Sequence, residues 1–353
     1  MAQSLKRKYP ILLIGPSWIG DLVQSQALIA YLHTRIPDCT VDCVLPPWTY
    51  PLAPRIPLLD LAYRLDVPHG RLGLTKRWLL GRELRARSYR QAFVLPRSWK
   101  AALPPFFAGI PRRTGFLGEM RYGLLNDIRK PPPRHTVPFI QQLLSLALLP
   151  GEPLPALIPE PRIRVDPEAR SRTLAQLGLD PGAEPGTIVA LLPGAEFGPA
   201  KRWPTESFAT LAKHLRSQGH AVWVLGSSRD QSMGRAIAAA ARGVTDLCGR
   251  TSLPEVADLL SAVSLAVTND SGLMHLAAAV GTPLVCLYGS SSMEYTPPGT
   301  RRAVLLSLHL DCSPCFAREC PLGHLNCLRQ LTVATVMEAV QQQLSAGRRS
   351  TTR

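Results

Sequence analysis

A loop rich in cations follows an apolar run in the second half of the chain. The run Thr187–Leu192 leads into Pro193–Pro204, which carries Glu196, Lys201 and Arg202. The apolar run predicts a buried parallel strand, and the carboxyl end of such a strand is where open α/β sheets bind ligands. Two cations at that edge favour a phosphate-binding loop, although loop cations are also often merely solvated.

A second polar junction, Thr268–His275, has the same strand-to-helix character. Asp270, Ser271 and Gly272 offer side-chain acceptors and free backbone N–H groups where a helix is expected to begin, which suits a pyrophosphate or a ribose. His275 lies one turn further on, on the same face as Ser271. The alternative interpretation is a capped helix whose histidine packs into the core.

Gly15–Asp21 places a carboxylate at a third such junction. Asp21 could act as a general base, and it could equally serve the helix start through capping and the helix dipole. The spacing differs from G-x-G-x-x-G, so the dinucleotide-binding fingerprint is absent.

Four cysteines lie close together in Cys312–Cys327, with His324 among them. Their spacing, C-x2-C, then x4-C and x6-C, is partly typical of zinc sites, but only the first pair forms a regular knuckle. We therefore expect a cysteine-rich loop without a metal. Reduced thiols are expected, since the start of the chain lacks a cleavable secretory pattern.

Strands and helices alternate along the chain. Strands are predicted at 10–15, 40–45, 91–95, 187–192, 221–225, 244–248, 265–268 and 284–288, and helices include 21–35, 82–89, 98–107, 137–149 and 333–344. A proline-rich stretch from 150 to 186 contains one short helix with Asp166 as N-cap, Pro167 in its first turn and Gly178 as its stop. The pattern predicts an α/β protein of two doubly wound domains with a cleft between them.

The domains are expected at 1–160 and 187–332, joined by a linker at 161–186 and followed by a helix and basic tail at 333–353. A length of 353 residues fits two domains, and 46% hydrophobic with 18% charged residues is a globular composition. The apolar stretches near residues 11 and 273 are interrupted by Gly and Pro, so neither predicts a membrane span. We expect a cytoplasmic protein.

The net charge of +15 implies an anionic partner: nucleic acid, a phosphorylated metabolite or a membrane surface. Aromatic residues make up 6%, and no nucleic-acid-binding motif is recognisable, so a phosphorylated ligand is favoured and no nucleic acid is expected.

Taken together, the motifs resemble those of the lipopolysaccharide heptosyltransferase family, most closely its heptosyltransferase II branch. They are Gly15–Asp21, 106–111, Arg113–Gly115, Gly118–Asp127, Pro193–Pro204 and Thr268–His275. The resemblance runs in order from residue 11 to about 298. It implies the two-domain GT-B glycosyltransferase fold. It also implies inverting transfer of heptose from ADP-L-glycero-β-D-manno-heptose to the first heptose of the inner core on Kdo2-lipid A, without a cofactor.

The resemblance also implies residue roles. Asp21 matches the catalytic base of the family, and Lys201 matches its contact to the donor phosphates. The family's donor motif corresponds to Asp270, Ser271, Gly272 and His275. Less specific donor neighbours, inferred from position, are Gly194, Glu196, Gly226 and Ser227.

Acceptor binding is predicted for cations of the first half, because the implied acceptor carries carboxylates and phosphates. The candidates are Arg97, Lys100, Arg112, Arg113 and Arg121. The acceptor is membrane-anchored, so peripheral contact with the anionic cytoplasmic face of the inner membrane is expected, and we expect a monomer. The alternatives are a heptosyltransferase I acting on Kdo2-lipid A, a non-catalytic phospho-ligand module, and a nucleic-acid-binding protein.

Overall fold

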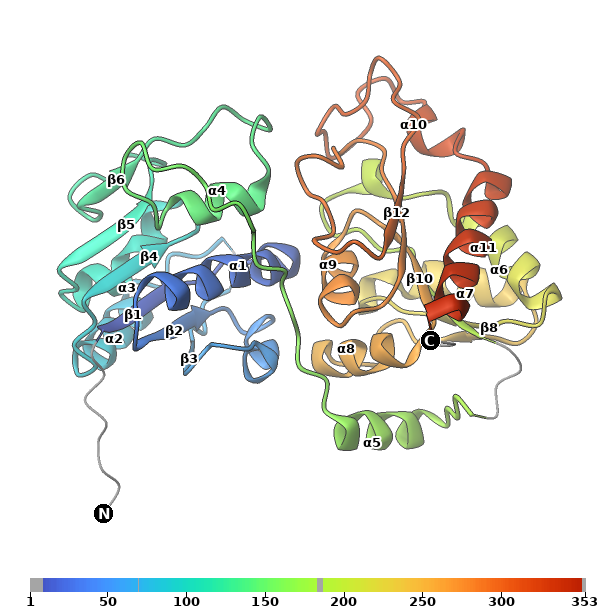
Figure 1. Cartoon of the computed structure of the whole chain (residues 1–353), viewed down its shortest axis with the longest axis horizontal. Coiled ribbons are helices and arrows are strands. Elements are labelled where there is room, and N and C mark those ends of the chain that lie inside the picture. The colour runs from blue at the N-terminus through green and yellow to red at the C-terminus, as the bar shows by residue number, and fades with distance from the viewer. Residues whose placement is uncertain (1–8, 69, 183–186, 351–353) are drawn as a thin grey trace. The chain divides into compact units, whose positions relative to one another are not determined.

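The computed structural model describes residues 9–68, 70–182 and 187–350. The chain divides into two compact units, Met1–Pro161 and Arg162–Arg353, and each contains its own sheet flanked by helices (Figure 1). The basic residues at positions 6–8 and the last three residues of the basic tail lie outside the described part.

Six parallel strands form the sheet of the first unit, in the order β3-β2-β1-β4-β5-β6. The strands are β1 Tyr9–Ile14, β2 Cys39–Leu45, β3 Ala62–Arg64, β4 Gln91–Val94, β5 Arg112–Phe116 and β6 Asp127–Arg129. β1 lies in the middle, paired with β2 and β4. Its residues Ile11, Leu12 and Leu13 have no exposed surface, which explains why the strand is apolar on both faces.

The helices of the first unit cover this sheet. They are α1 Ile19–Arg35, α2 Leu74–Arg85, α3 Leu103–Phe107 and α4 Phe139–Ser145, with 3-10 turns η1 Tyr50–Arg55 and η2 Trp99–Ala102. The predicted helix at 82–89 was wrong in its bounds. α2 begins eight residues earlier, after Gly73, whose left-handed φ of 58° starts the helix without a capping side chain. No N-cap signal therefore marked its beginning.

The second sheet repeats the topology of the first. Its order is β12-β11-β10-β7-β8-β9, again all parallel. The strands are β7 Ile188–Leu192, β8 Ala221–Val224, β9 Val244–Asp246, β10 Leu265–Asn269, β11 Leu284–Leu287 and β12 Ala303–Leu306. Numbered along the chain, the strands of both sheets lie in the order 3-2-1-4-5-6. This is the doubly wound order, in which the sheet grows in one direction from strand 1 to strand 3 and in the other from strand 4 to strand 6.

The helices of the second unit include the one predicted inside the proline-rich stretch. They are α5 Pro167–Leu177, α6 Thr205–Ser217, α7 Gln231–Ala240, α8 Leu253–Ala262, α9 Gly272–Ala279, α10 Asn326–Arg329 and α11 Val333–Ser350, with 3-10 turns η3 Pro199–Lys201 and η4 Ser228–Asp230. In α5 the Asp166 side chain accepts from two backbone N–H groups, and Gly178 ends the helix with φ of 68°. The Asp166 amide also donates to Asp258 of α8 at 3.3 Å, so this helix is part of the second unit.

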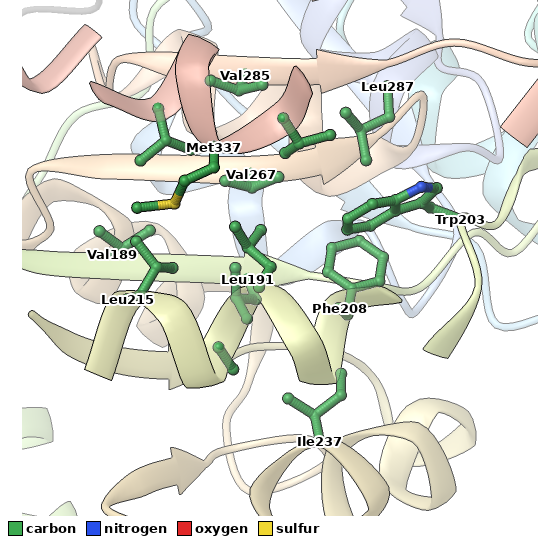
Figure 2. Close-up of a cluster of buried hydrophobic side chains, with 14 of the residues drawn as sticks. Val189, Leu191, Trp203, Phe208, Leu215, Ile237, Val267, Val285, Leu287 and Met337 are labelled. Atoms are coloured by element: carbon green, nitrogen blue, oxygen red, sulfur yellow. The ribbon is translucent and has the colours of Figure 1, made fainter. Parts of the chain in front are cut away.

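The core of the second unit lies between β7, β10, β11 and the helices α6, α7 and α11 (Figure 2). Trp203 and Phe208 meet edge to face at 4.9 Å between ring centroids, a favourable aromatic geometry. Met337 of α11 belongs to the same cluster. The Trp203 indole also donates to the Leu331 carbonyl at 2.9 Å, so the end of the cation-bearing loop is anchored in the core.

Among the helices of residues 9–68, 70–182 and 187–350, none is both long enough and apolar enough to cross a bilayer.

Candidate functional site

Two of the predicted site loops leave neighbouring strands of the second sheet. β7 precedes Pro193–Pro204, β10 precedes Asp270–His275, and the two strands pair directly. They are strands 1 and 4 of the doubly wound order, where helices depart to opposite faces and the loops separate. This is the position at which such sheets bind their ligands.

Asn269, the last residue of β10, holds the two loops together. Its amide nitrogen donates to the Pro193 carbonyl at 2.7 Å, and its amide oxygen accepts from the Trp203 backbone N–H at 3.0 Å. One fully buried side chain thus binds both ends of the cation-bearing loop. The loop is also closed on itself, because the Arg202 guanidinium donates to the Ala195 carbonyl. Asn269 was not singled out from the sequence.

Lys201 and Asp270 form an ion pair across the two loops. The Lys201 ammonium lies 2.6 Å from a carboxylate oxygen of Asp270, and their side chains are 16% and 4% exposed. The same carboxylate oxygen accepts from the Thr296 hydroxyl at 3.1 Å. The Lys201 ammonium also lies 5.1 Å from the centre of the Phe197 ring. Such partners fix a cation in one place, so it can meet an arriving anion without further ordering.

The start of α9 adds hydrogen-bond donors beside this pair. Ser271 is the N-cap residue in extended conformation, and its hydroxyl does not cap the helix. That hydroxyl is buried and has no hydrogen-bonding partner among the described residues. Gly272 opens the helix, so the backbone N–H groups of the first turn have no partner within it. The arrangement suits an anionic ligand oxygen.

His275 is buried one turn into α9 and is held neutral. Burial lowers its pKa to about 4, and Lys201 acts in the same direction, while Asp270 and a hydrogen bond with the Pro298 backbone oppose the shift. A neutral imidazole can donate or accept a hydrogen bond without adding charge beside the Lys201–Asp270 pair.

Three of the predicted donor neighbours converge on Asp230. Its carboxylate accepts from both the backbone N–H and the hydroxyl of Ser227, at 2.8 Å each. A Cβ added to Gly194 would lie 2.6 Å from an Asp230 carboxylate oxygen, and one added to Gly226 would lie 2.8 Å from the Asp230 Cβ. Both glycines are therefore needed for close approach. Asp230 was missed, although Ser227-x-x-Asp230 has the capping-box spacing that marks a helix start.

Glu196 lies apart from these contacts. It pairs with Arg229, and their side chains are 49% and 75% exposed. An exposed pair of this kind contributes little to stability. Glu196 contacts neither the Lys201–Asp270 pair nor the groups around Asp230 in the hydrogen bonds described above.

In the first unit, Asp21 lies in the first turn of α1 and is half-buried. The helix begins two residues earlier than predicted and its N-cap is Trp18, so Asp21 is not the capping residue. The preceding Gly15 packs tightly on β2: its N–H donates to Val44, and an added Cβ would lie 2.5 Å from Leu45. β1 and β4 are strands 1 and 4 of this sheet, between which the strand order reverses. Asp21 follows β1, and Arg97 and Lys100 follow β4, so all three come after the two strands where such sheets bind ligands.

A cavity of about 310 Å³ opens at this end of the first sheet. Loops after β1, β2, β3 and β4 contribute Ser17, Trp48, Val67 and Lys100 to its lining. Arg71 and Arg77 also line it, so the cavity has a cationic side. The Lys100 ammonium donates to the Gly70 carbonyl at 3.1 Å.

The predicted acceptor-binding arginines differ in their surroundings. Arg97 is exposed, donates to Gln142 and lies over the Phe116 ring. Arg121 is 1% exposed and donates to the carbonyls of Phe116, Pro96 and Ser98, and burial lowers its pKa to about 10. Arg113 donates to the Ile110 and Leu124 carbonyls. Arg121 and Arg113 are thus used to brace loops, whereas Arg112 pairs with Asp127 at 2.9 Å.

The cysteine-rich segment packs on the second unit's site loop. The Arg318 carbonyl accepts from the Ala200 N–H at 3.0 Å, and its guanidinium covers the Phe197 ring. All eight cysteines are free. Across the described ranges, no group of three or more His, Cys, Asp or Glu side chains is arranged to hold a metal ion.

Comparison with known proteins gives a consistent result. Residues 77–326 match the family model for glycosyltransferase family 9 (heptosyltransferase). The chain is 40% identical to lipopolysaccharide heptosyltransferase 2 of Escherichia coli K12, over 93% of this chain and 96% of that one. It is 39% identical to the Salmonella typhimurium protein of the same name, over 95% and 98%. The solved structure of E. coli ADP-heptose LPS heptosyltransferase II superposes with a TM-score of 0.85 and 38% identity, covering 96% and 99% of the two chains.

Proposed function

Because the chain belongs to glycosyltransferase family 9, the heptosyltransferases, we propose that it transfers heptose from ADP-heptose to the first heptose of the lipopolysaccharide inner core. Two parallel six-stranded sheets with flanking helices make up its GT-B fold. The structural observation that carries the proposal is the ion pair between the half-buried Lys201 and the buried Asp270, beside the start of α9.

The donor diphosphate is assigned to the second unit. Lys201 and the N–H groups at the start of α9 would meet the charge that grows on the leaving ADP, which is the work a preorganised cation does best. Asp270 holds the ammonium in position. Ser271 and the neutral His275 supply hydrogen bonds to the ADP-sugar, and Gly194, Gly226 and Ser227 shape its neighbourhood around Asp230.

Asp21 is assigned as the general base. Its carboxylate would take the proton of the acceptor hydroxyl while that oxygen bonds to C1 of the heptose and the bond from C1 to the diphosphate oxygen breaks. A half-buried position in the first turn of α1 supports this role, since the N-cap position is already occupied by Trp18. The products of this step are the glycosylated acceptor, ADP and a protonated Asp21.

The acceptor is assigned to the first unit, with Arg97 and Lys100 as its contacts. Both follow β4, and Lys100 lines the cationic cavity. Because the proposed acceptor carries a lipid anchor, we propose that the enzyme works at the cytoplasmic face of the inner membrane as a peripheral protein, and as a monomer.

The deciding experiment offers ADP-heptose with two acceptors, Kdo2-lipid A and its mono-heptosylated form, and measures product mass. We expect one heptose to be added only to the mono-heptosylated form. Addition only to Kdo2-lipid A would overturn the assignment in favour of a heptosyltransferase I. Binding of ADP-heptose without transfer to either would point to a non-catalytic module.

A further inference from the structure

Helix α2 exposes an unusual set of large apolar side chains. Leu74, Trp78 and Leu79 are 51%, 43% and 52% exposed, and Leu72, just before the helix, is also exposed. Single exposed apolar residues are ordinary on protein surfaces, but four within eight residues form a patch that needs an explanation.

The packing of α2 does not account for these side chains. Its buried residues are Arg77, Leu80, Gly81 and Leu84, which recur every three or four positions and therefore share one face. At Gly81 an added Cβ would lie 2.5 Å from Phe107, so this face fits closely against α3. Trp78 and Leu79 lie off this stripe on the outer face of the helix. Leu74 lies closer to the stripe, three residues before Arg77, and is exposed because it is the first residue of the helix.

Cations surround the same apolar residues. Positions 71–90 contain seven Lys and Arg residues against a single acidic residue, Glu83. All seven except Arg77 are exposed. The Arg82 guanidinium lies 5.0 Å from the centre of the Trp78 ring, which leaves aromatic and cation together on the outer face. Trp and Leu flanked by Lys and Arg are the composition of helices that lie in the interface of an anionic bilayer.

The start of α2 is joined to the cationic cavity of the first unit. The buried Arg77 guanidinium donates to the Leu72 carbonyl at 2.7 Å and to the Lys100 carbonyl at 3.0 Å. Arg71, which precedes the exposed Leu72, lines the cavity itself. A surface that meets the membrane here would therefore place the cavity next to the lipid headgroups.

We propose that the exposed surface at the start and outer side of α2, formed by Leu72, Leu74, Trp78 and Leu79 with Lys76 and Arg82, docks on an anionic lipid bilayer. The apolar side chains enter the interface and the cations meet anionic headgroups, whose negative charge complements the cation excess of residues 71–90. The proposal rests on the proposed function in one respect: a membrane-borne acceptor then reaches the cavity from the side that faces the bilayer.

The test is co-sedimentation of the full chain with phosphatidylglycerol/phosphatidylethanolamine vesicles and with phosphatidylcholine vesicles. We expect binding to the anionic vesicles that weakens with added salt, and weak binding to the neutral ones. For the double variant Trp78→Glu/Leu79→Glu, the partition coefficient on anionic vesicles should fall at least about tenfold, because the variant adds two negative charges and removes two apolar anchors. Leu157→Glu, at a residue 81% exposed outside this surface, is the matched control and should bind like the unaltered protein.

Equal binding of the double variant and the Leu157→Glu control would overturn the proposal, as would failure of the unaltered protein to bind anionic vesicles at low salt. Circular dichroism and thermal unfolding establish that the variants are folded. Heptose transfer to a deacylated, water-soluble acceptor should be unchanged in the double variant. If the unaltered protein does not transfer heptose, the proposed function is wrong. The vesicle measurement still decides whether the α2 surface binds anionic membranes.

Discussion

Lys201 reaches across from the loop after β7 to lie 2.6 Å from Asp270, which follows the neighbouring strand β10. Asp270 is almost completely buried, so each charge depends on the other. Breaking a buried pair by removing one partner leaves an uncompensated charge, which costs more than the pair itself contributes.

Lys201→Met is expected to reduce kcat about 100- to 1000-fold, as removal of a preorganised electrostatic contact does. It should also destabilise the second unit by about 3 kcal/mol, because Asp270 is left buried without its cation. Steady-state kinetics and chemical unfolding measure the two effects.

The double variant Lys201→Met/Asp270→Asn separates these effects. A neutral amide no longer requires the cation, so we expect stability to recover while activity stays low. Recovery of both would show that Lys201 acts through the fold and has no role at the diphosphate.

Asp21→Asn is expected to lower kcat about 100- to 10,000-fold with little change in ADP-heptose affinity, because the amide cannot accept the acceptor's proton. Single-turnover kinetics and calorimetry with the donor distinguish the two quantities. Glu160→Gln, at an exposed acidic residue, is the control and should behave as the unaltered enzyme. Full turnover in Asp21→Asn would remove Asp21 from the mechanism.

Stability should depend on pH through His275. Its pKa is about 4 in the folded protein and 6.5 ordinarily, so between these values the unfolded chain binds a proton that the folded chain does not. The contribution of this neutral histidine is therefore complete above pH 6.5 and is lost as pH falls toward 4, amounting to about 3 kcal/mol.

Thermal unfolding midpoints between pH 4.5 and 8 test this dependence. His275→Gln should flatten the acid side of the curve, whereas His214→Gln, at an exposed histidine, should leave it unchanged. An equally steep acid slope in His275→Gln would assign the effect to another group.

Gly198→Ala should displace the Lys201 loop. The added Cβ would lie 2.4 Å from the Arg318 carbonyl oxygen, and backbone cannot move aside as a flexible side chain can. We expect a loss of about 1–3 kcal/mol in stability and a raised KM for the donor.

Gly182→Ala provides the control, since its closest approach is 3.3 Å to the side chain of Asp180. A wild-type KM in Gly198→Ala would mean that the position of this loop does not govern donor binding.

The parts of the fold that could be predicted from sequence are those with local signals. Asp166, Pro167 and Gly178 each carry a side-chain or backbone preference that marks a helix boundary, and all three act as expected. β5 was missed because Arg112 and Arg113 give it no apolar alternation. Its strand character comes from pairing with β4 and β6, which is a tertiary effect.

The residues of the candidate site likewise fall into those with a local sequence signal and those whose role depends on the folded chain. Lys201 and Asp270 are recognisable because charged residues at strand ends are a local pattern, and the neighbouring strands bring them together. The burial of Arg121 was not predictable, since its partners are carbonyls of residues 96, 98 and 116 that only the folded chain assembles. Asn269 was missed for a similar reason: its role depends on both ends of a loop in another part of the sequence.

The shared strand order of the two sheets has a consequence for evolution. In each unit the residue assigned the leading chemical role follows strand 1: Asp21 lies in the first turn of α1, after β1, and Lys201 lies in the loop after β7. The two units thus use the same strand order for the two different tasks proposed here, proton removal in the first and anion binding in the second. If each proposed task belongs to its own sheet, substitutions in the first unit can change the choice of acceptor without altering the nucleotide-sugar site of the second.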